Sequence, residues 1–198
     1  RLGGHRDAIG EADHVAFAQP LGIAHEGLPA ARVDPLVQRR ADGRAARALA
    51  HALAFEPGRV IAGNAGVLLT RVVRVKSGLS SPFVIVDAAM NDLARPALYG
   101  AWHDFEPVAA TDRRMTANIV GPICETGDTF ATDRDCPALV AGDLAVFRTA
   151  GAYGATMASS YNSRGFVAET LVDGDRYAVV ADRIAASAIM DAERVPEW

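Results

Sequence analysis

From residue 60 onward, short apolar runs alternate with turn-forming residues, a pattern typical of a strand-rich domain. Val72 and Val75 lie in a segment that alternates with polar residues, and residues 83–87 are a compact apolar run, so both segments predict strands. Asp173-Gly174-Asp175 is a strong signal for a hairpin turn. Further strands are expected at 117–120, 143–147, 168–172 and 177–180.

Helical patterns are fewer and mostly short. Asp34 is a suitable helix cap and Pro35 suits a first turn, so residues 34–54 predict a helix, with a short buried strand at 53–55. Residues 1–31 have no clear periodicity. Together these patterns favour a mainly β or α+β chain. Short helices are also expected at the start of 61–69 and at 92–102, 151–158 and 184–194.

Composition narrows the class of protein. The chain has 198 residues, of which 50% are hydrophobic, so a packed core is expected. Its net charge of −4 gives no electrostatic case for binding nucleic acid or an anionic membrane. No apolar run is long enough to span a bilayer, and the first residues lack an apolar signal core. The two cysteines make no disulfide framework, so a reducing cytoplasm is the expected location.

Reactive side chains gather in four short motifs. Residues 121–128, Gly-Pro-Ile-Cys-Glu-Thr-Gly-Asp, hold the Cys124 thiol and the Glu125 carboxylate on turn-rich backbone. A thiol can donate a proton, and a carboxylate can bind an ammonium group. The five histidines have no metal-ligand spacing, so no metal site is expected. The other three motifs are Glu56-Pro57-Gly58-Arg59, residues 91–99 (Asn-Asp-Leu-Ala-Arg-Pro-Ala-Leu-Tyr) and residues 150–154 (Ala-Gly-Ala-Tyr-Gly).

Taken singly, each motif has an ordinary structural explanation, such as a Pro-Gly turn, a surface arginine or a core tyrosine. In this order, however, the four motifs resemble the diaminopimelate decarboxylases, pyridoxal-phosphate enzymes of the alanine racemase-like barrel class. The resemblance covers residues 53–198 closely and 20–52 weakly. Residues 161–164, Tyr-Asn-Ser-Arg, also match the family, without a role that the sequence assigns.

The resemblance implies a fold, a reaction and a partner. Residues 60–198 would form a C-terminal β-sandwich or β-barrel domain, and residues 1–59 would be an incomplete remnant of a TIM-type (β/α)8 barrel. The parent enzyme would convert meso-2,6-diaminopimelate to L-lysine and CO2 with pyridoxal 5'-phosphate as cofactor. It would act as a homodimer, with the loop at 121–128 reaching the partner's active site.

The resemblance also implies roles for single residues. Cys124 would be the catalytic proton donor, and Glu56 would hold the proton on the pyridine nitrogen of the cofactor. Arg95 and Tyr99 are four residues apart, so on a helix they would share a face. The implied cofactor contacts are Glu56, Gly58, Arg59 and Tyr153, and the implied substrate contacts are Arg59, Arg95, Tyr99, Glu125 and Tyr153.

Two departures from the family pattern suggest that this chain alone lacks decarboxylase activity. Its only lysine is Lys76, at the end of an expected strand, whereas the family's cofactor-binding lysine lies far upstream. Before Leu21-Gly22-Ile23, Ala18-Gln19-Pro20 replaces the family's phosphate-binding triple glycine, and a proline offers no amide donor. Two other functions stay open: a free-standing β-domain for dimerisation, and a decarboxylase of the same family acting on carboxynorspermidine or ornithine.

Overall fold

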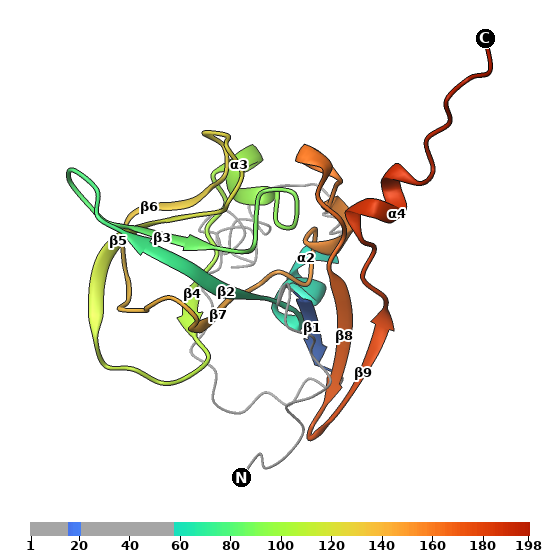
Figure 1. Cartoon of the computed structure of the whole chain (residues 1–198). Helices are drawn as coiled ribbons and strands as arrows, with labels where there is room; N and C mark the ends of the chain where they lie inside the picture. The colour runs from blue at the N-terminus through green and yellow to red at the C-terminus, as the bar shows by residue number, and fades with distance from the viewer. Residues whose placement is uncertain (1–15, 21–57) are drawn as a thin grey trace, which may run out of the picture.

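The computed structural model describes residues 16–20 and 58–198 of the chain (Figure 1). In these residues nine strands form one curved, nearly closed, barrel-like sheet with the order β6-β5-β3-β2-β1-β8-β9, while β7 pairs with β2 and β4. The strands are β1 (Ala16–Pro20), β2 (Val67–Lys76), β3 (Phe83–Val86), β4 (Phe105–Pro107), β5 (Arg114–Val120), β6 (Thr129–Pro137), β7 (Leu144–Phe147), β8 (Ala168–Asp173) and β9 (Arg176–Ala181).

Short helical segments connect the strands and carry much of the chemistry. The α-helices are α2 (Gly58–Ala62), α3 (Arg95–Tyr99) and α4 (Ala186–Met190). Single 3-10 turns follow as η2 (Gly63–Ala65), η3 (Ala155–Met157) and η4 (Tyr161–Ser163). Figure 1 shows α4 and the chain end projecting away from the sheet.

Strand β2 is the spine of the fold. Its first residues pair antiparallel with β1 and β7, and its last residues pair antiparallel with β3. A register shift lies between Val72 and Arg74, within the part of β2 that pairs with β3. Such an irregularity bends a strand and increases its twist, which helps the sheet to curl.

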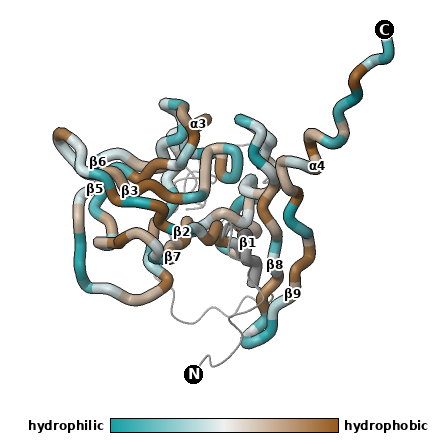
Figure 2. The backbone as a smooth tube through the Cα atoms, viewed as in Figure 1, coloured by the Kyte–Doolittle hydropathy of each residue, from teal (hydrophilic) through white to brown (hydrophobic). Residues whose placement is uncertain are grey.

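The core lies inside this curled sheet. Alternate residues of β2, among them Leu68 and Val72, point inward, as the period of two along a strand requires. Phe147 is fully buried and packs against Phe105 and Phe130, with ring centroids 5.0 and 4.4 Å apart. Figure 2 shows hydrophobic residues along β2 and β3, and also along β8 and β9.

Most of the expected strands are confirmed, including β3, β5, β7 and the β8–β9 hairpin, where Gly174 has the left-handed φ of 62°. Three helices were expected too long. Residues 151–158 form a turn and η3, because Tyr153 has a left-handed φ of 61°, which is incompatible with a right-handed helix. Helix α3 ends where Gly100 takes a left-handed φ. None of the residues of α4 is buried, so no tertiary packing stabilises a longer helix there.

Strands β1, β4 and β6 were not expected from the sequence. β6 lies at one end of the sheet order and holds the charged run Asp133-Arg134-Asp135, which disfavours a strand by propensity. Its extended antiparallel pairing with β5 compensates, and Arg114 on β5 adds an exposed 2.7 Å ion pair with Asp135 across the two strands. Helix 34–54 and strand 53–55 lie outside the described residues.

Candidate active site

A pocket of about 490 Å³ opens where three separate segments meet. Gly58 and Arg59 come from α2, Arg95 and Tyr99 from α3, and Tyr153 from the turn after β7. These five are the cofactor and substrate residues expected from three of the four motifs, apart from Glu56, which lies outside the described residues. The fold therefore brings together side chains that are up to 95 positions apart in the sequence.

Arg95 lies between two aromatic rings. Its guanidinium carbon is 5.5 Å from the ring centroid of Tyr99 and 5.5 Å from that of Tyr153. Helix α3 places Arg95 and Tyr99 on one face, as their spacing predicts, and Gly100 ends the helix directly afterwards. Because a cation near an aromatic face is attracted to it, the two tyrosines restrict where the guanidinium can point.

The turn that carries Tyr153 is strained and firmly anchored. Thr149 and Tyr153 have left-handed φ angles of 60° and 61°, which are uncommon for residues with a Cβ. The amide of Ala150 donates to the carbonyl of Gly66 at 2.9 Å, and the amide of Gly151 donates to that of Gly63 at 3.0 Å. The turn is thus bonded to the residues that follow α2, which fixes Tyr153 relative to Arg59.

The pocket favours an anion. Among the described residues, its lining holds two guanidinium groups, Arg59 and Arg95, and two phenols, but no carboxylate. His103 is not among these lining residues; it is buried, and desolvation lowers the pKa of its ring. The charge of Arg95 lowers that pKa further. Guanidinium and phenol donors suit a phosphate or a carboxylate, and the volume is in the usual range of about 300–1,000 Å³ for a small-molecule site.

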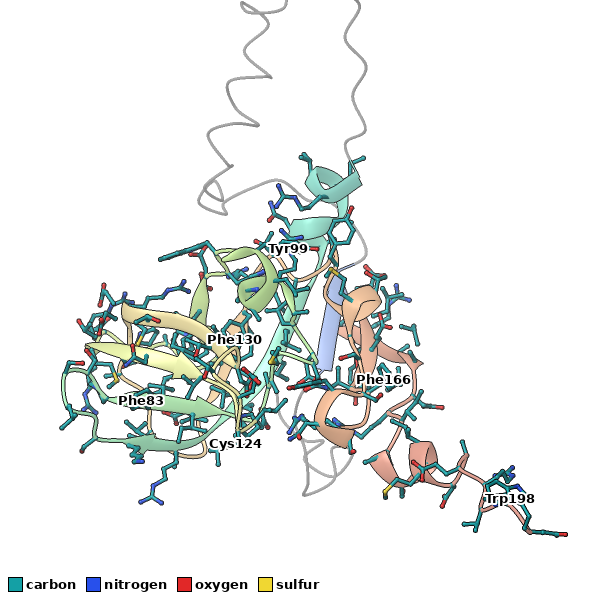
Figure 3. The ribbon with its side chains drawn as sticks, turned by 90° about the horizontal axis from the view of Figure 1, so that it is seen from above. Phe83, Tyr99, Cys124, Phe130, Phe166 and Trp198 are labelled. Atoms are coloured by element: carbon teal, nitrogen blue, oxygen red, sulfur yellow. The ribbon has the colours of Figure 1, made fainter. Side chains whose placement is uncertain are left out.

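The fourth motif forms a second, separate group. Cys124 and Glu125 are both exposed on the loop between β5 and β6. The Glu125 carboxylate accepts the amide of Gly127 at 3.1 Å and the hydroxyl of Tyr161 at 3.4 Å. Figure 3 shows Cys124 well apart from Tyr99, so within one chain the thiol does not reach the pocket.

Below this loop lies a polar network to which the sequence assigned no role. Arg164 donates to the Asn91 side chain at 2.9 Å and to the Asp87 carbonyl at 2.8 Å. It also lies 3.7 Å from the carboxylate of Asp92, which is 1% exposed. Desolvation raises the pKa of Asp92 to about 6, although its bond to the Ala89 amide and the charge of Arg164 oppose that rise.

A second buried carboxylate, Asp128, holds the loop itself. It is 2% exposed and accepts the amides of Met90 and Ile123, each at 2.7 Å. Two of the expected motifs contain Asp92 and Asp128, and the family match at 161–164 contains Arg164. The sequence could have pointed to this network only through those motif matches. That its carboxylates are buried, which makes their hydrogen bonds important for stability, is visible only in the fold.

Two other sequence expectations concern cofactor binding. Lys76 ends β2, whose first residue follows Gly66 beside the Tyr153 turn. A ten-residue strand extends about 30 Å, so Lys76 is far from the pocket. Ala18-Gln19-Pro20 belongs to strand β1, which pairs with β2 and β8, and so does not form a phosphate-binding loop.

Two classes of feature are absent from residues 16–20 and 58–198. No group of three or more His, Cys, Asp or Glu side chains there could hold a metal ion. In the same residues, no helix has the length and apolar character needed to cross a membrane.

Comparisons with known proteins agree on one family. The family model described as pyridoxal-dependent decarboxylase, C-terminal sheet domain, matches residues 13–151. Diaminopimelate decarboxylase of Zymomonas mobilis is 51% identical over 74% of this chain and 35% of its own length. The enzyme of that name from Archaeoglobus fulgidus is 41% identical over 95% of this chain and 46% of its own length. The chain thus spans a third to a half of these curated relatives.

Solved structures show the same likeness. Diaminopimelate decarboxylase of Helicobacter pylori, complexed with L-lysine, superimposes with a TM-score of 0.62 at 38% identity, covering 67% of this chain and 33% of that chain. A lysine/ornithine decarboxylase from Vibrio vulnificus, complexed with cadaverine, has a TM-score of 0.52 at 19% identity, covering 60% of this chain and 32% of that chain. At that identity the likeness is one of fold alone.

Proposed function

This chain belongs to the pyridoxal-dependent decarboxylases, whose C-terminal sheet domain it contains, and from that premise we propose that it acts as the C-terminal part of a diaminopimelate decarboxylase. The proposed reaction converts meso-diaminopimelate to L-lysine and CO2. Residues 60–198, joined by strand β1 (Ala16–Pro20), would be the β-domain, and the rest of residues 1–59 would be a part of the cofactor-binding barrel. The observation that carries the proposal is the clustering of Arg59, Arg95, Tyr99 and Tyr153 around one anion-favouring pocket.

The pocket residues fit the phosphate-bearing cofactor of the family. Arg59 and Tyr153 offer hydrogen-bond donors to an anion, and the backbone at Gly58 leaves open space, since a Cβ there would meet no described residue within 4 Å. The chemistry that bound pyridoxal phosphate supplies is an electron sink for the carbanion left when CO2 departs. The lysine that must hold the cofactor comes from outside this chain, because Lys76 is too distant.

The remaining roles concern recognition and proton transfer. Arg95, oriented by two tyrosine rings, would bind the substrate's distal carboxylate, and Glu125 would bind the distal ammonium group. Cys124 would donate its thiol proton to the carbon from which CO2 has left. A substrate with an amino acid group at each end requires both contacts, which favours diaminopimelate over a diamine precursor such as ornithine.

A homodimer would complete the site. Cys124 lies well apart from Tyr99 of the pocket, and Glu125 is its neighbour in the chain, so one chain would not apply all of these residues to one substrate. A second copy would bring its own loop to the first copy's pocket. Val60 and Ile61 on α2 are 63% and 65% exposed and offer apolar surface for contact with the lysine-bearing barrel or a partner. The proposed location is the cytoplasm.

A chimera tests this proposal. Residues 58–198 would replace the matching C-terminal part of the Zymomonas mobilis enzyme, and CO2 release from meso-diaminopimelate would be measured. We expect activity within about ten-fold of the parent and a loss of about 10²-fold or more for Cys124→Ala. Cys136→Ala is the matched control, since Cys136 is buried in the core away from the loop. A folded, cofactor-loaded chimera without activity would refute the proposal, as would full activity of Cys124→Ala.

A further inference from the structure

The loop that presents Cys124 and Glu125 is held by one buried carboxylate. The two oxygens of Asp128 accept one backbone amide each, from Met90 and from Ile123, at 2.7 Å. Ile123 directly precedes Cys124, so the second bond fixes the backbone next to the thiol. Hydrogen bonds to a buried charge are stronger than neutral ones, and losing them leaves an amide without a partner.

The rest of the loop is built around this carboxylate. At Gly121, a Cβ would lie 2.3–2.5 Å from the side chain of Asp128, so only glycine leaves room for it. The Gly121 amide donates to the Asp128 carbonyl, and the Asp128 amide donates to the Glu125 carbonyl, both at 3.0 Å. The loop therefore closes on itself through Asp128 and presents Cys124 and Glu125 outward.

The segment that Asp128 grips is itself fixed. Met90 is next to Asn91 and Asp92, which Arg164 holds through a hydrogen bond and an ion pair. Desolvation raises the pKa of Asp128, whereas the two amide bonds and the charge of Arg164 lower it. The buried charge thus has a nearby compensating cation, and the loop is attached to a rigid part of the fold.

We propose that Asp128 is a positioning residue, whose carboxylate bridges the amides of Met90 and Ile123 and so sets where Cys124 and Glu125 meet the substrate. This inference rests on the proposed function, since that function gives Cys124 and Glu125 their roles. Asp128 touches no substrate in this scheme and acts through the loop backbone.

Amide hydrogen exchange on the full chain tests the positioning directly. In Asp128→Asn, one carboxylate oxygen becomes an NH2 group that cannot accept a hydrogen bond. We expect exchange at Ile123, Met90 or both to rise about ten-fold to a hundred-fold, the equivalent of one charge-assisted bond. The core thiol of Cys136 should stay unreactive to iodoacetamide, which reports that the fold is intact. Unchanged exchange at both amides would overturn the inference.

A glycine pair covers the case in which Asp128→Asn unfolds the chain and exposes Cys136. Gly121→Ala displaces the Asp128 carboxylate, whereas Gly127→Ala places a methyl group in ordinary contact, 3.5 Å from the nearest Met90 atom. Faster exchange at Ile123 in Gly121→Ala but not in Gly127→Ala, with Cys136 protected, supports the inference. Equal exchange in the two variants overturns it.

Kinetics in the chimera separate positioning from plain stabilisation. Asp128→Asn should lower kcat about ten-fold or more and also raise KM, because both Cys124 and Glu125 move. A loss of folded enzyme would leave KM unchanged, and that result would count against positioning. In the Cys124→Ala background, the further loss in kcat should be small. An active Cys124→Ala chimera would refute the proposed function without affecting the hydrogen-exchange result. Failure of the proposed function can therefore be distinguished from failure of the positioning proposal.

Discussion

Gly151→Ala should destabilise the domain by a steric route that the structure defines closely. An alanine Cβ there would lie 2.3 Å from the carbonyl oxygen of Ala62 and 2.6 Å from the amide nitrogen of Gly66. Both are backbone atoms, so neither can rotate away. Gly151 does not have a left-handed φ, which means that the cost comes from contact and not from backbone strain.

The magnitude follows from what must move. Relieving the overlap shifts the turn away from the residues after α2 and stretches two hydrogen bonds, Ala150 to Gly66 and Gly151 to Gly63. Each bond contributes about 1 kcal/mol, and overpacking alone costs about 1–3 kcal/mol. We therefore expect the free energy of unfolding to fall by about 2–4 kcal/mol, a large share of the about 5–15 kcal/mol that domains have.

Urea unfolding followed by circular dichroism measures this loss. Gly58→Ala is the matched control, because a Cβ at Gly58 meets no residue of the described part of the chain within 4 Å. The same substitution there should change stability by less than about 1 kcal/mol, in the stabilising direction. If Gly151→Ala proved as stable as Gly58→Ala, the close packing of the Tyr153 turn on Gly66 would be wrong, and so would the geometry of the pocket.

Three further predictions concern other parts of the molecule. In the chimera, Arg95→Gln should lower kcat/KM for meso-diaminopimelate about ten-fold to a hundred-fold, since a charge-assisted contact to the distal carboxylate is lost; unchanged CO2 release would contradict that contact. The pKa of Asp92 is about 6 in the folded protein against an ordinary value of 3.8, so the folded state binds this proton more tightly than the unfolded state does. Protonation of Asp92 therefore stabilises the folded state increasingly as pH falls from 7 to 4. Urea titrations at pH 7.5 and pH 4 should show wild type gaining about 2–3 kcal/mol relative to Asp92→Asn, and no pH-dependent difference would refute this. Because Gly174 has a left-handed φ of 62°, Gly174→Ala should lower the free energy of unfolding by about 1 kcal/mol, and Gly174→Asn should lower it by less. Thermal unfolding measures both losses, and equal melting temperatures of wild type and the two variants would contradict the turn geometry.

The exposed thiol and the buried carboxylate below it illustrate two kinds of sequence signal. Cys124 was identified because a thiol beside an acid in a turn is chemically conspicuous. Asp128, four residues later in the same motif, was given no role, because an aspartate after glycine is common in turns. Only its burial at 2% exposure, with two amides on its oxygens, makes it important.

The local pattern alone determined the strands β3, β5, β7 and the β8–β9 hairpin, because alternation and turn residues act over a few positions. It also determined that Arg95 and Tyr99 share a helix face. Tertiary structure alone decided the pairing of β6, the strand formed by Ala16–Pro20 and the early end of α4, because partners distant in sequence supply or withhold those hydrogen bonds and contacts. It also decided which site residues meet. Arg59 and Tyr153 meet because the start of β2 pairs with the end of β7, and α3, which follows β3, adds Arg95 to the same pocket. Cys124 lies on the loop between β5 and β6, well apart from Tyr99.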